Sequence, residues 1–259
     1  MVFMSETGTQ RRKTALVTGA SRGIGRAVAE RLAREGVLVA VHFGRDEAAA
    51  KEVVAGIESE GGSGFAVGGD LGSVDFAALL DEVDEGFLGL GAPAGLDILI
   101  NNAGITVMKG VDAMTPAEFD TLFATNVRAP FFLVQGILDR LREGGRVVNL
   151  SSAVTRIAIP DILAYTMTKG AIDTFTRVLA QALGSRGITV NAVAPGYVLT
   201  DMNAWLIDNP DGQREAAANV ALGRVGRPAD IADIVAFLVS DDARWITGQT
   251  LDASGGTAL

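Results

Sequence analysis

Tyr165 and Lys169 lie four positions apart in a stretch that reads as a helix, and Ser152 lies a short distance upstream. Residues at positions i and i+4 share one face of a helix, so the Lys169 ammonium can lie beside the Tyr165 phenol. A positive charge beside a phenol lowers its pKa and makes proton transfer usable near neutral pH. The three side chains together predict a proton-transfer site, although a packed tyrosine followed by a solvated lysine has the same spacing.

Short apolar runs alternate with longer amphipathic segments along the chain, which predicts strands alternating with helices. The first run, Ala15-Leu16-Val17, is apolar on both faces, as in parallel strands that helices cover on both sides. We therefore expect an α/β fold, a single doubly wound Rossmann-like sheet of about seven parallel strands. Gly144 and Gly145 read as the end of a helix. The predicted strands are residues 14–18, 37–43, 64–67, 96–101, 146–150, 188–193 and 250–252, and the predicted helices are residues 25–35, 46–60, 74–87, 116–142, 165–184 and 228–240.

Composition limits the class of protein. The 259 residues, 48% of them hydrophobic, can form one large domain, which we expect to span residues 13–259 after a flexible polar leader over residues 1–12. No apolar run approaches the roughly 18 residues of a membrane span. The absence of Cys suits a reducing compartment, and the N-terminus lacks a secretory apolar region, so we expect a cytoplasmic protein. A net charge of −9 repels polyanions, so we expect no nucleic-acid partner.

The single histidine, His42, lies near the end of an apolar run. One histidine and no cysteine cannot supply the usual transition-metal ligands, and no Ser-His-Asp triad has a recognisable spacing here. We expect no metal site, and we interpret His42 as a structural or cofactor-facing residue.

A glycine-rich turn follows the first predicted strand, and a helix follows the turn. Glycine lets a phosphate approach the backbone, and a helix N-terminus attracts negative charge. The spacing of Gly19, Gly23 and Gly25 departs from the common dinucleotide fingerprint, and the lysine of an ATP-binding P-loop is missing. The turn therefore favours a nucleotide pyrophosphate, with a tight strand-to-helix turn that binds nothing as the alternative.

From residue 13 to residue 256 the chain resembles the short-chain dehydrogenase/reductases, because several motifs occur in the order typical of that family. These motifs are the turn from Thr18 to Gly25, then Asp70, Asn101-Asn102-Ala103-Gly104, the set Asn126, Ser152, Tyr165 and Lys169, and Pro195-Gly196 followed by Thr200. The resemblance is nearest to 3-oxoacyl-thioester reductases and polyketide ketoreductases. It implies that the cofactor contacts Gly19, Ser21, Arg22, Gly23, Ile24, Gly25, Phe43, Arg45, Asp70, Leu71, Asn102, Ala103, Gly104, Tyr165, Lys169, Pro195, Gly196, Val198 and Thr200.

The resemblance also implies an enzyme that interconverts a ketone and a secondary alcohol by hydride transfer. Tyr165 would be the general acid or base, and Ser152 would hydrogen-bond the substrate oxygen. Lys169 would hold the nicotinamide ribose, and Asn126 would position a water. Ser151 competes with Ser152, and only the family's spacing to Tyr165 favours the second serine.

Three of these motifs have structural alternatives. The 101–104 motif could simply end a strand in a turn. Asn126 could be a hydrogen-bonded polar residue of the core. Thr200 could cap the helix that Asp201 begins.

The charges near the second strand favour NADP(H) over NAD(H). NAD binding in this fold usually needs a carboxylate at the end of that strand, where this chain has Phe43. Arg45 follows two residues later and Arg22 lies in the glycine-rich turn, so two guanidinium groups could meet a 2′-phosphate. Asp46 is the reservation, because a shifted strand end would place its carboxylate near the ribose.

The substrate and the assembly are less defined. Residues 198–222 resemble the family's mobile substrate lid, and their apolar residues suit a hydrophobic small-molecule carbonyl or alcohol. An NAD-dependent secondary-alcohol or sugar dehydrogenase and a non-catalytic nucleotide-binding regulator are the alternatives. The family's assemblies imply a homo-oligomer, a dimer or tetramer, formed through residues 116–142 and 165–184. Aromatic and aliphatic residues there could form that interface or pack within one monomer, namely Phe119, Phe123, Phe131, Phe132, Phe175 and Leu179.

Overall fold

Seven strands form one parallel sheet in the order β3-β2-β1-β4-β5-β6-β7. The computed structural model describes residues 11–259, so the first ten residues of the predicted leader lie outside the described chain. The predicted doubly wound, Rossmann-like α/β fold is confirmed. The strands are β1 (Thr14–Val17), β2 (Leu38–Phe43), β3 (Ser63–Gly68), β4 (Leu96–Asn101), β5 (Leu141–Leu150), β6 (Thr189–Pro195) and β7 (Thr250–Ala253).

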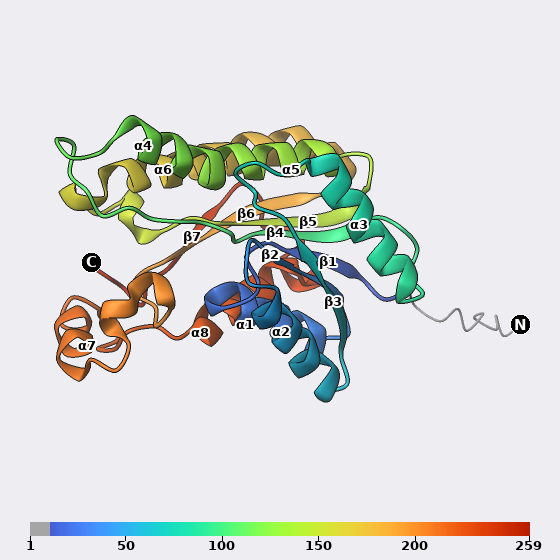
Figure 1. Cartoon of the computed structure of the whole chain (residues 1–259), viewed down its shortest axis with the longest axis horizontal. Coiled ribbons are helices and arrows are strands. Elements are labelled where there is room, and N and C mark those ends of the chain that lie inside the picture. The colour runs from blue at the N-terminus through green and yellow to red at the C-terminus, as the bar shows by residue number, and fades with distance from the viewer. Residues whose placement is uncertain (1–10) are drawn as a thin grey trace, which may run out of the picture.

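Helices connect the strands and cover both faces of the sheet (Figure 1). Helices α1, α2 and α8 lie on one face, and α3, α4, α5 and α6 lie on the other. No helix within residues 11–259 is both long and apolar enough to cross a membrane. The α-helices are α1 (Gly23–Arg34), α2 (Glu47–Ser59), α3 (Phe76–Gly89), α4 (Pro116–Phe123), α5 (Ala129–Ile137), α6 (Leu163–Leu183), α7 (Pro210–Ala217) and α8 (Pro228–Val239).

Each face of the sheet has its own hydrophobic core. Neighbouring residues of β1 point to opposite faces, and both are fully buried: Val17 packs in the core under α1 and α8, and Leu16 in the core under α3 and α5. Fully burying one such aliphatic side chain contributes about 1.5–3 kcal/mol. The two cores hold the strand ends in fixed positions, and the site residues follow those ends.

The predicted helix over residues 116–142 is wrong in its continuity and in its end. Helix α4 is followed by a π-helical turn, η1 (Ala124–Arg128), and α5 ends at Ile137. Leu141 begins β5, because it is buried and pairs with Leu96 of β4. Gly144 and Gly145, interpreted from the sequence as a helix end, instead lie within β5, where the pairing with β4 shifts its register.

The predicted leader also extends two residues too far. The guanidinium of Arg11 donates two hydrogen bonds to the Asp97 carboxylate, at 2.8 and 2.7 Å. The amide of Thr14 donates to the same carboxylate at 2.8 Å. Asp97 therefore fixes the chain ahead of β1, which the polar composition of this segment did not indicate.

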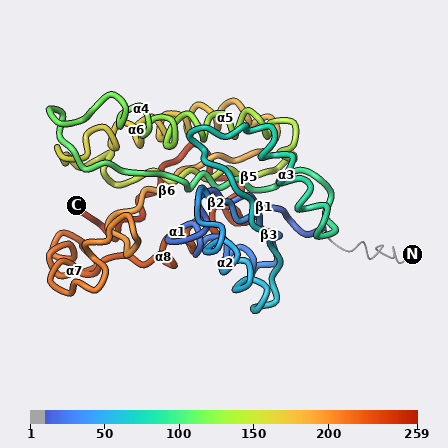
Figure 2. Tube along the Cα trace, viewed as in Figure 1, coloured from blue at the N-terminus to red at the C-terminus, as the bar shows by residue number. Residues whose placement is uncertain are grey.

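The chain changes direction across the sheet between β1 and β4. From β1 it proceeds to β2 and β3 on one side, and from β4 to β7 on the other. In open parallel sheets, ligands bind beyond the carboxyl ends of the strands at such a switch point. The segment after β6, residues 196–227, also leaves the sheet at this end and carries a 3₁₀ segment, η5 (Asp201–Leu206), and α7; it is drawn in orange in Figure 2.

Candidate active site

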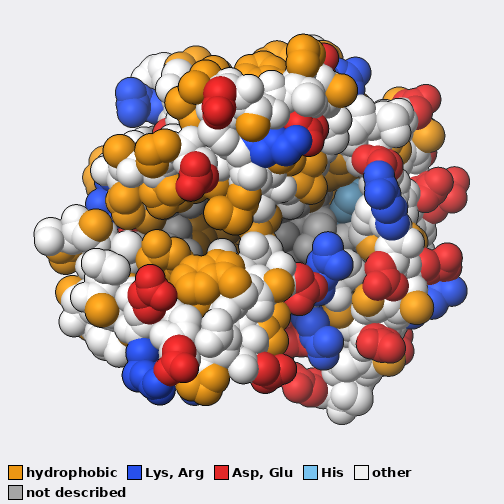
Figure 3. Space-filling view, turned by 60° about the vertical axis from the view of Figure 1, so that its left-hand side comes forward, with side chains coloured by type: hydrophobic (Ala, Val, Ile, Leu, Met, Phe, Trp, Pro, Cys, Tyr) orange, Lys and Arg blue, Asp and Glu red, His pale blue; other side chains and the backbone are white. Residues whose placement is uncertain are grey.

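The ends of four neighbouring strands bring the predicted site residues to one edge of the sheet. Val17, Asn101, Leu150 and Pro195 are the last residues of β1, β4, β5 and β6, which are adjacent in the sheet. The glycine-rich turn, the 102–104 motif and the two candidate serines follow three of them. Figure 3 shows a hollow across this end, with hydrophobic side chains gathered about its left part and charged side chains about its right part.

The glycine-rich turn needs its glycines for two physical reasons. Gly19 and Gly23 have φ angles of +60° and +57°, which side chains rarely allow. A Cβ on Gly19 would lie 2.9 Å from the Cα of Ala103, and one on Gly25 would lie 2.4 Å from the carbonyl oxygen of Gly19. Glycine therefore lets the turn fold tightly upon itself and against the loop after β4.

Thr18 and Asn102 join the turn to that loop. The Asn102 side-chain amide donates to the carbonyls of Thr18 at 2.7 Å and Gly19 at 3.0 Å. The Thr18 hydroxyl accepts from the backbone amides of Asn102 at 2.9 Å and Ala103 at 3.0 Å. The alternative that the 101–104 motif merely ends a strand is therefore wrong, because its second asparagine holds the glycine-rich turn. Sequence reasoning missed the role of Thr18, for which its place at the head of the turn was the available signal.

The N-terminus of α1 suits an anion. Its N-cap residue, Arg22, makes no capping hydrogen bond, and the first turn contains no acidic residue. The neighbouring helices α2, α3 and α4 are instead capped by Asp46, Asp75 and Thr115. The first amides of α1 thus point toward the turn without a side-chain acceptor, and the helix dipole adds positive charge. Ser21 and Ile24 belong to this same turn and first helical residues, so this part of the chain fits a dinucleotide pyrophosphate.

Strand β2 ends at Phe43, the position that the sequence indicated. Asp46 accepts a hydrogen bond from the amide of Ala49 at 3.0 Å and caps α2, so its carboxylate is engaged there. Arg45 is 87% exposed and lies 3.3 Å from a carboxylate oxygen of Asp70. The pKa of Asp70 is lowered, first by a hydrogen bond from the backbone amide of Gly72 and then by one from Arg45.

Arg22, the N-cap residue of α1, is also exposed. Its Nε lies 3.3 Å from a carboxylate oxygen of Asp201, at the start of η5. Both arginines thus have exposed carboxylate partners. These pairs are exposed, and exposed ion pairs contribute little, so a phosphate can replace either carboxylate.

Tyr165 lies in the first turn of α6 and is 8% exposed. Burial raises the pKa of its phenol to about 12, and a hydrogen bond with the Ser152 side chain acts in the opposite direction. The expectation that Lys169 lowers this pKa is not met, because the Lys169 Nζ lies 5.5 Å from the centre of the Tyr165 ring and donates to the carbonyl of Leu150 at 2.7 Å. The phenol is therefore protonated at neutral pH.

Lys169 itself is buried under the loop after β4. Burial lowers its pKa to about 8, and the Asp173 carboxylate, one turn further along α6, opposes that change. A Cβ on Gly104 would lie 3.6 Å from the Lys169 Nζ and 3.5 Å from the Asn126 Oδ1. Glycine at this position therefore keeps the space in front of both polar groups open.

Asn126 lies in the π-helical turn η1, a distortion that is frequent at functional sites. Its Oδ1 accepts from the amide of Ile105 at 2.9 Å, and its Nδ2 donates to the carbonyl of Ile105 at 2.9 Å and to the Thr168 hydroxyl at 3.2 Å. Asn126 thus ties the loop after β4 to α6, close to Lys169. It is a hydrogen-bonded buried residue, and it also borders the site.

The two candidate serines differ in their surroundings. The hydroxyl of Ser151 is buried and has no hydrogen-bond partner among residues 11–259. The hydroxyl of Ser152 accepts from the amide of Val154 at 3.4 Å, and the Ser152 side chain acts to lower the pKa of the Tyr165 phenol. The structure therefore favours Ser152, as the spacing did.

The segment after β6 lies close to the glycine-rich turn. Thr200 makes no capping hydrogen bond, so the alternative that its side chain caps the following helix is wrong. Its methyl group lies 3.4 Å from where a Cβ of Gly23 would be, so Thr200 faces the glycine-rich turn. Gly196 packs closely on Ser254, where a Cβ would approach to 2.8 Å. The ring of Tyr197, a residue that the sequence analysis did not single out, makes an edge-to-face contact with the ring of Trp205.

Two of the predicted contact residues have buried side chains. Leu71 and Val198 are 5% and 2% exposed and pack into the two cores. Only their backbones are placed to reach a ligand. Among residues 11–259, no group of three or more His, Asp or Glu side chains is arranged to hold a metal ion.

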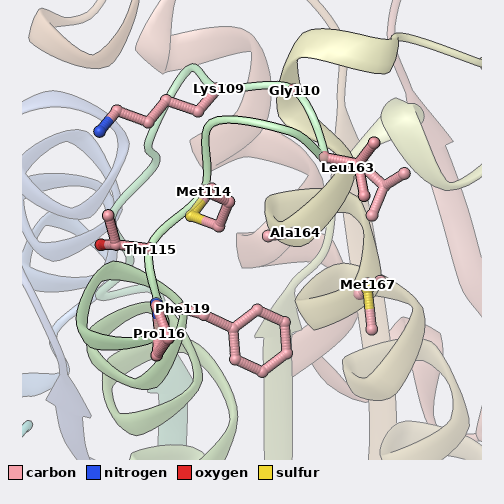
Figure 4. A pocket seen from close by; sticks show the side chains of 10 residues that line it. Lys109, Gly110, Met114, Thr115, Pro116, Phe119, Leu163, Ala164 and Met167 are labelled. Carbon is pink, nitrogen blue, oxygen red and sulfur yellow. The ribbon is translucent and has the colours of Figure 1, made fainter.

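A separate apolar pocket of about 330 Å³ lies beside the first turns of α6 (Figure 4). Ala164 and Met167, which flank Tyr165 in sequence, line it, but Tyr165, Ser152 and Lys169 do not. Its lining is Lys109, Gly110, Val111, Met114, Thr115, Pro116, Phe119, Leu163, Ala164 and Met167.

Comparison with known proteins agrees with this geometry. A family model described as enoyl-(acyl carrier protein) reductase matches residues 19–258. The structure of the angucycline C-6 ketoreductase LanV with bound NADP is 47% identical, covers 97% of both chains and superposes with a TM-score of 0.90. Versicolorin reductase of Emericella nidulans is 41% identical over 256 residues, covering 94% of this chain and 95% of its own length.

A third relative is also a reductase. The 3-oxoacyl-[acyl-carrier-protein] reductase of Staphylococcus aureus is 40% identical over 247 residues, covering 94% of this chain and 97% of its own length. The range that the family model matches includes Tyr165, Lys169 and the C-terminal strand β7. The chain belongs to the short-chain dehydrogenase/reductase family of oxidoreductases.

Proposed function

We propose that this protein is an NADP(H)-dependent ketoreductase in which Tyr165 is the general acid. The observation that carries the proposal is the buried phenol of Tyr165, whose pKa the Ser152 side chain acts to lower. This phenol lies one helical turn from Lys169, at the edge of the sheet where the glycine-rich turn lies. The relative LanV, whose structure contains NADP, is a ketoreductase, which supports the same assignment.

The proposed reduction places each side chain in a defined role. The nicotinamide, when bound, supplies a hydride to the carbonyl carbon. As negative charge grows on the carbonyl oxygen, the Tyr165 hydroxyl donates its proton to that oxygen. The raised phenol pKa keeps this proton in place at neutral pH, as a general acid requires. The Ser152 hydroxyl donates to the same oxygen and stabilises its charge.

The reverse reaction needs the phenolate of Tyr165, so oxidation of an alcohol is favoured at alkaline pH. Lys169 is cationic below a pH of about 8, and we assign it the support of the nicotinamide ribose and of charge on the phenol oxygen. Asn126 holds the loop that covers Lys169, through the backbone of Ile105. Positioning of a water by Asn126 is part of the proposal and follows from the family resemblance.

The proposed dinucleotide site extends from α1 to the end of β2. The amides at the start of α1 bind the pyrophosphate, and Thr200 and Gly196 border the nicotinamide. Arg22 and Arg45 bind the 2′-phosphate that distinguishes NADPH from NADH. Each arginine then exchanges an exposed carboxylate partner for the phosphate.

We propose a bulky, largely apolar polyketide ketone as the substrate. The lid segment exposes Met202, Trp205 and Ile207, each between 42% and 45% accessible. Tyr197 and Trp205 pack edge to face with their ring centres 6.0 Å apart, which forms an aromatic corner on the lid. The 47% identity to an angucycline ketoreductase, against 40% to the 3-oxoacyl reductase, favours a polyketide over an acyl thioester.

A panel of ketones tests this assignment. The purified protein is mixed with NADPH or NADH and with an angucycline ketone, a 3-oxoacyl thioester or a ketose, and cofactor oxidation is followed by absorbance. We expect the highest kcat/KM with NADPH and the angucycline ketone. Turnover of the ketose with NADH alone would instead indicate the sugar dehydrogenase, and cofactor binding without any turnover would indicate a regulator.

We also propose a homo-oligomer, a dimer or tetramer, assembled through α4, α5 and α6. Phe131 is 49% exposed and Val178 is 63% exposed, so these helices present apolar side chains to solvent. A shallow apolar surface around Phe131 extends this face. Sedimentation should give a mass above that of one 26.8 kDa chain at micromolar concentration, and a monomer mass would contradict the assembly. A cytoplasmic location belongs to the same proposal and has the cysteine-free sequence as its support.

A further inference from the structure

His42 is the only histidine of the chain and lies at the penultimate position of β2, where the side chain is 1% exposed. It is placed between two loops at the carboxyl edge of the sheet. One is the glycine-rich turn after β1, and the other begins at Gly69, directly after β3. None of the reaction steps above uses this imidazole.

Both ring nitrogens of His42 have a backbone partner. The amide of Gly19 donates to Nδ1 at 3.2 Å, and Nε2 lies 2.9 Å from the carbonyl oxygen of Gly69. Because an amide can only donate and a carbonyl can only accept, the ring must be neutral with its proton on Nε2. Burial lowers the pKa of His42 to about 4, which keeps the ring in this neutral form at neutral pH.

The backbone of His42 reinforces the same attachment. Its carbonyl accepts from the amide of Ala20 at 2.7 Å, so two successive amides of the glycine-rich turn point toward one residue of β2. This leaves the later amides, at the start of α1, for an anion. Gly19 has a positive φ and no side chain, so the imidazole is the side-chain contact that fixes the orientation of its amide.

The imidazole therefore connects both ends of the proposed dinucleotide site. On one side it holds Gly19, next to the proposed pyrophosphate position. On the other it holds Gly69, which precedes Asp70, the partner of Arg45. A change in this ring would move the turn without touching the catalytic tyrosine.

We propose that His42 is a positioning residue that sets the affinity for the dinucleotide by holding the Gly19 amide through Nδ1. This inference rests on the proposed function, because it assumes that the glycine-rich turn binds NADPH. Loss of the Nδ1 contact should weaken NADPH binding and raise its KM, whereas kcat at saturating NADPH should change little.

Two substitutions separate the two ring nitrogens. In His42→Asn the amide oxygen can occupy the position of Nδ1 and accept from Gly19, but the side chain is too short to reach Gly69. In His42→Gln the longer amide can donate to Gly69, but no acceptor remains at the position of Nδ1. Val41→Ala, a fully buried residue of the same strand, is a matched control that loses core packing but no contact to the turn.

The measurements are the Kd for NADPH from fluorescence titration, the Tm of the cofactor-free protein, and kcat and KM for NADPH. We expect His42→Asn to bind within about threefold of the parent, and His42→Gln to bind about tenfold or more weakly, as for loss of a buried hydrogen-bond acceptor. Val41→Ala should lower the Tm and leave the Kd unchanged.

The outcomes distinguish this inference from the proposed function. If the parent binds NADPH and His42→Gln binds it equally well, or if the Kd of every variant simply follows its Tm, the positioning role is wrong. If the parent binds neither NADPH nor NADH, the proposed function fails and the inference fails with it.

Discussion

Neutralising Arg45 should reduce the preference of the enzyme for NADPH, because only NADPH carries a 2′-phosphate. Hydrogen bonds to charged groups contribute about 1.5–3 kcal/mol. Arg45 is exposed and already lies 3.3 Å from Asp70, so binding exchanges one anionic partner for another. We therefore expect the lower end of that range, about tenfold in kcat/KM for NADPH, with kcat/KM for NADH within about threefold of the parent.

The same reasoning applies to Arg22→Gln, because Arg22 also exchanges a carboxylate partner, Asp201. If the two arginines act independently, the double variant should lose roughly a hundredfold in kcat/KM for NADPH. Combining Phe43→Asp with Arg45→Gln should reverse the preference, since the new carboxylate accepts from the ribose hydroxyl and repels phosphate.

Arg26→Gln is the matched control for these changes in charge. Arg26 lies on α1 and pairs with Glu30 of the same helix, 2.7 Å away, so its loss should leave the cofactor ratio unchanged. The assay is the ratio of kcat/KM for NADPH and NADH in the parent and each variant. A parent that prefers NADH, or Arg45 and Arg22 variants whose ratio equals that of Arg26→Gln, would refute the placement of the 2′-phosphate.

Three further changes test other parts of the site. Asp173→Asn removes the negative charge that raises the pKa of Lys169. The fall in reductase activity at alkaline pH, expected near pH 8 in the parent, should therefore shift to lower pH in a pH–rate profile. An unshifted profile would count against Lys169 as the group that causes the fall. The folded-state pKa of His42 is lowered from 6.5 to about 4, so between these values only the unfolded state takes up the proton and the parent loses stability as pH falls. By pH 4 this effect should lower the free energy of unfolding of the parent by about 3 kcal/mol, as measured by denaturant unfolding, and His42→Asn should lack it. Equal losses in both proteins would contradict the lowered pKa of His42. Gly19→Ala should abolish NADPH binding in a titration, because the backbone at this position has a positive φ and the added Cβ would clash with the backbone of Ala103. Gly44→Ala should bind NADPH as the parent does, because a Cβ at this position would meet no atom within 4 Å.

The arrangement of the strands was predictable because each buried strand of a parallel sheet reads as a continuous apolar run. The start of β5 was not, since Leu141-Arg142-Glu143 contains polar residues and follows a helix without a break in the pattern. Leu141 joins the sheet because Leu96 is present to pair with it, and that pairing is long-range. Helix and strand cannot be separated by local sequence at such a boundary.

That the candidate site residues gather at one edge of the sheet was predictable, but their energetics were not. The spacing of Tyr165 and Lys169 places them on one helix face, yet it does not say where the ammonium points. The carbonyl of Leu150, from a distant strand, takes that hydrogen bond. Burial, which raises the pKa of Tyr165, also depends on the packing of the whole domain. The role of His42 was left open for the same reason, since its two partners come from loops far apart in sequence.

Tyr165→Phe is the most direct test of Tyr165 as the general acid, because it removes the phenol hydroxyl and little else. The measurement is single-turnover reduction of a ketone substrate at saturating NADPH, together with the Kd for NADPH by titration. We expect the rate to fall by about 10²–10⁴-fold, the usual contribution of a general acid, with a Kd within about threefold of the parent. A variant that binds NADPH and reduces the ketone within about threefold of the parent rate would show that Tyr165 is not the acid.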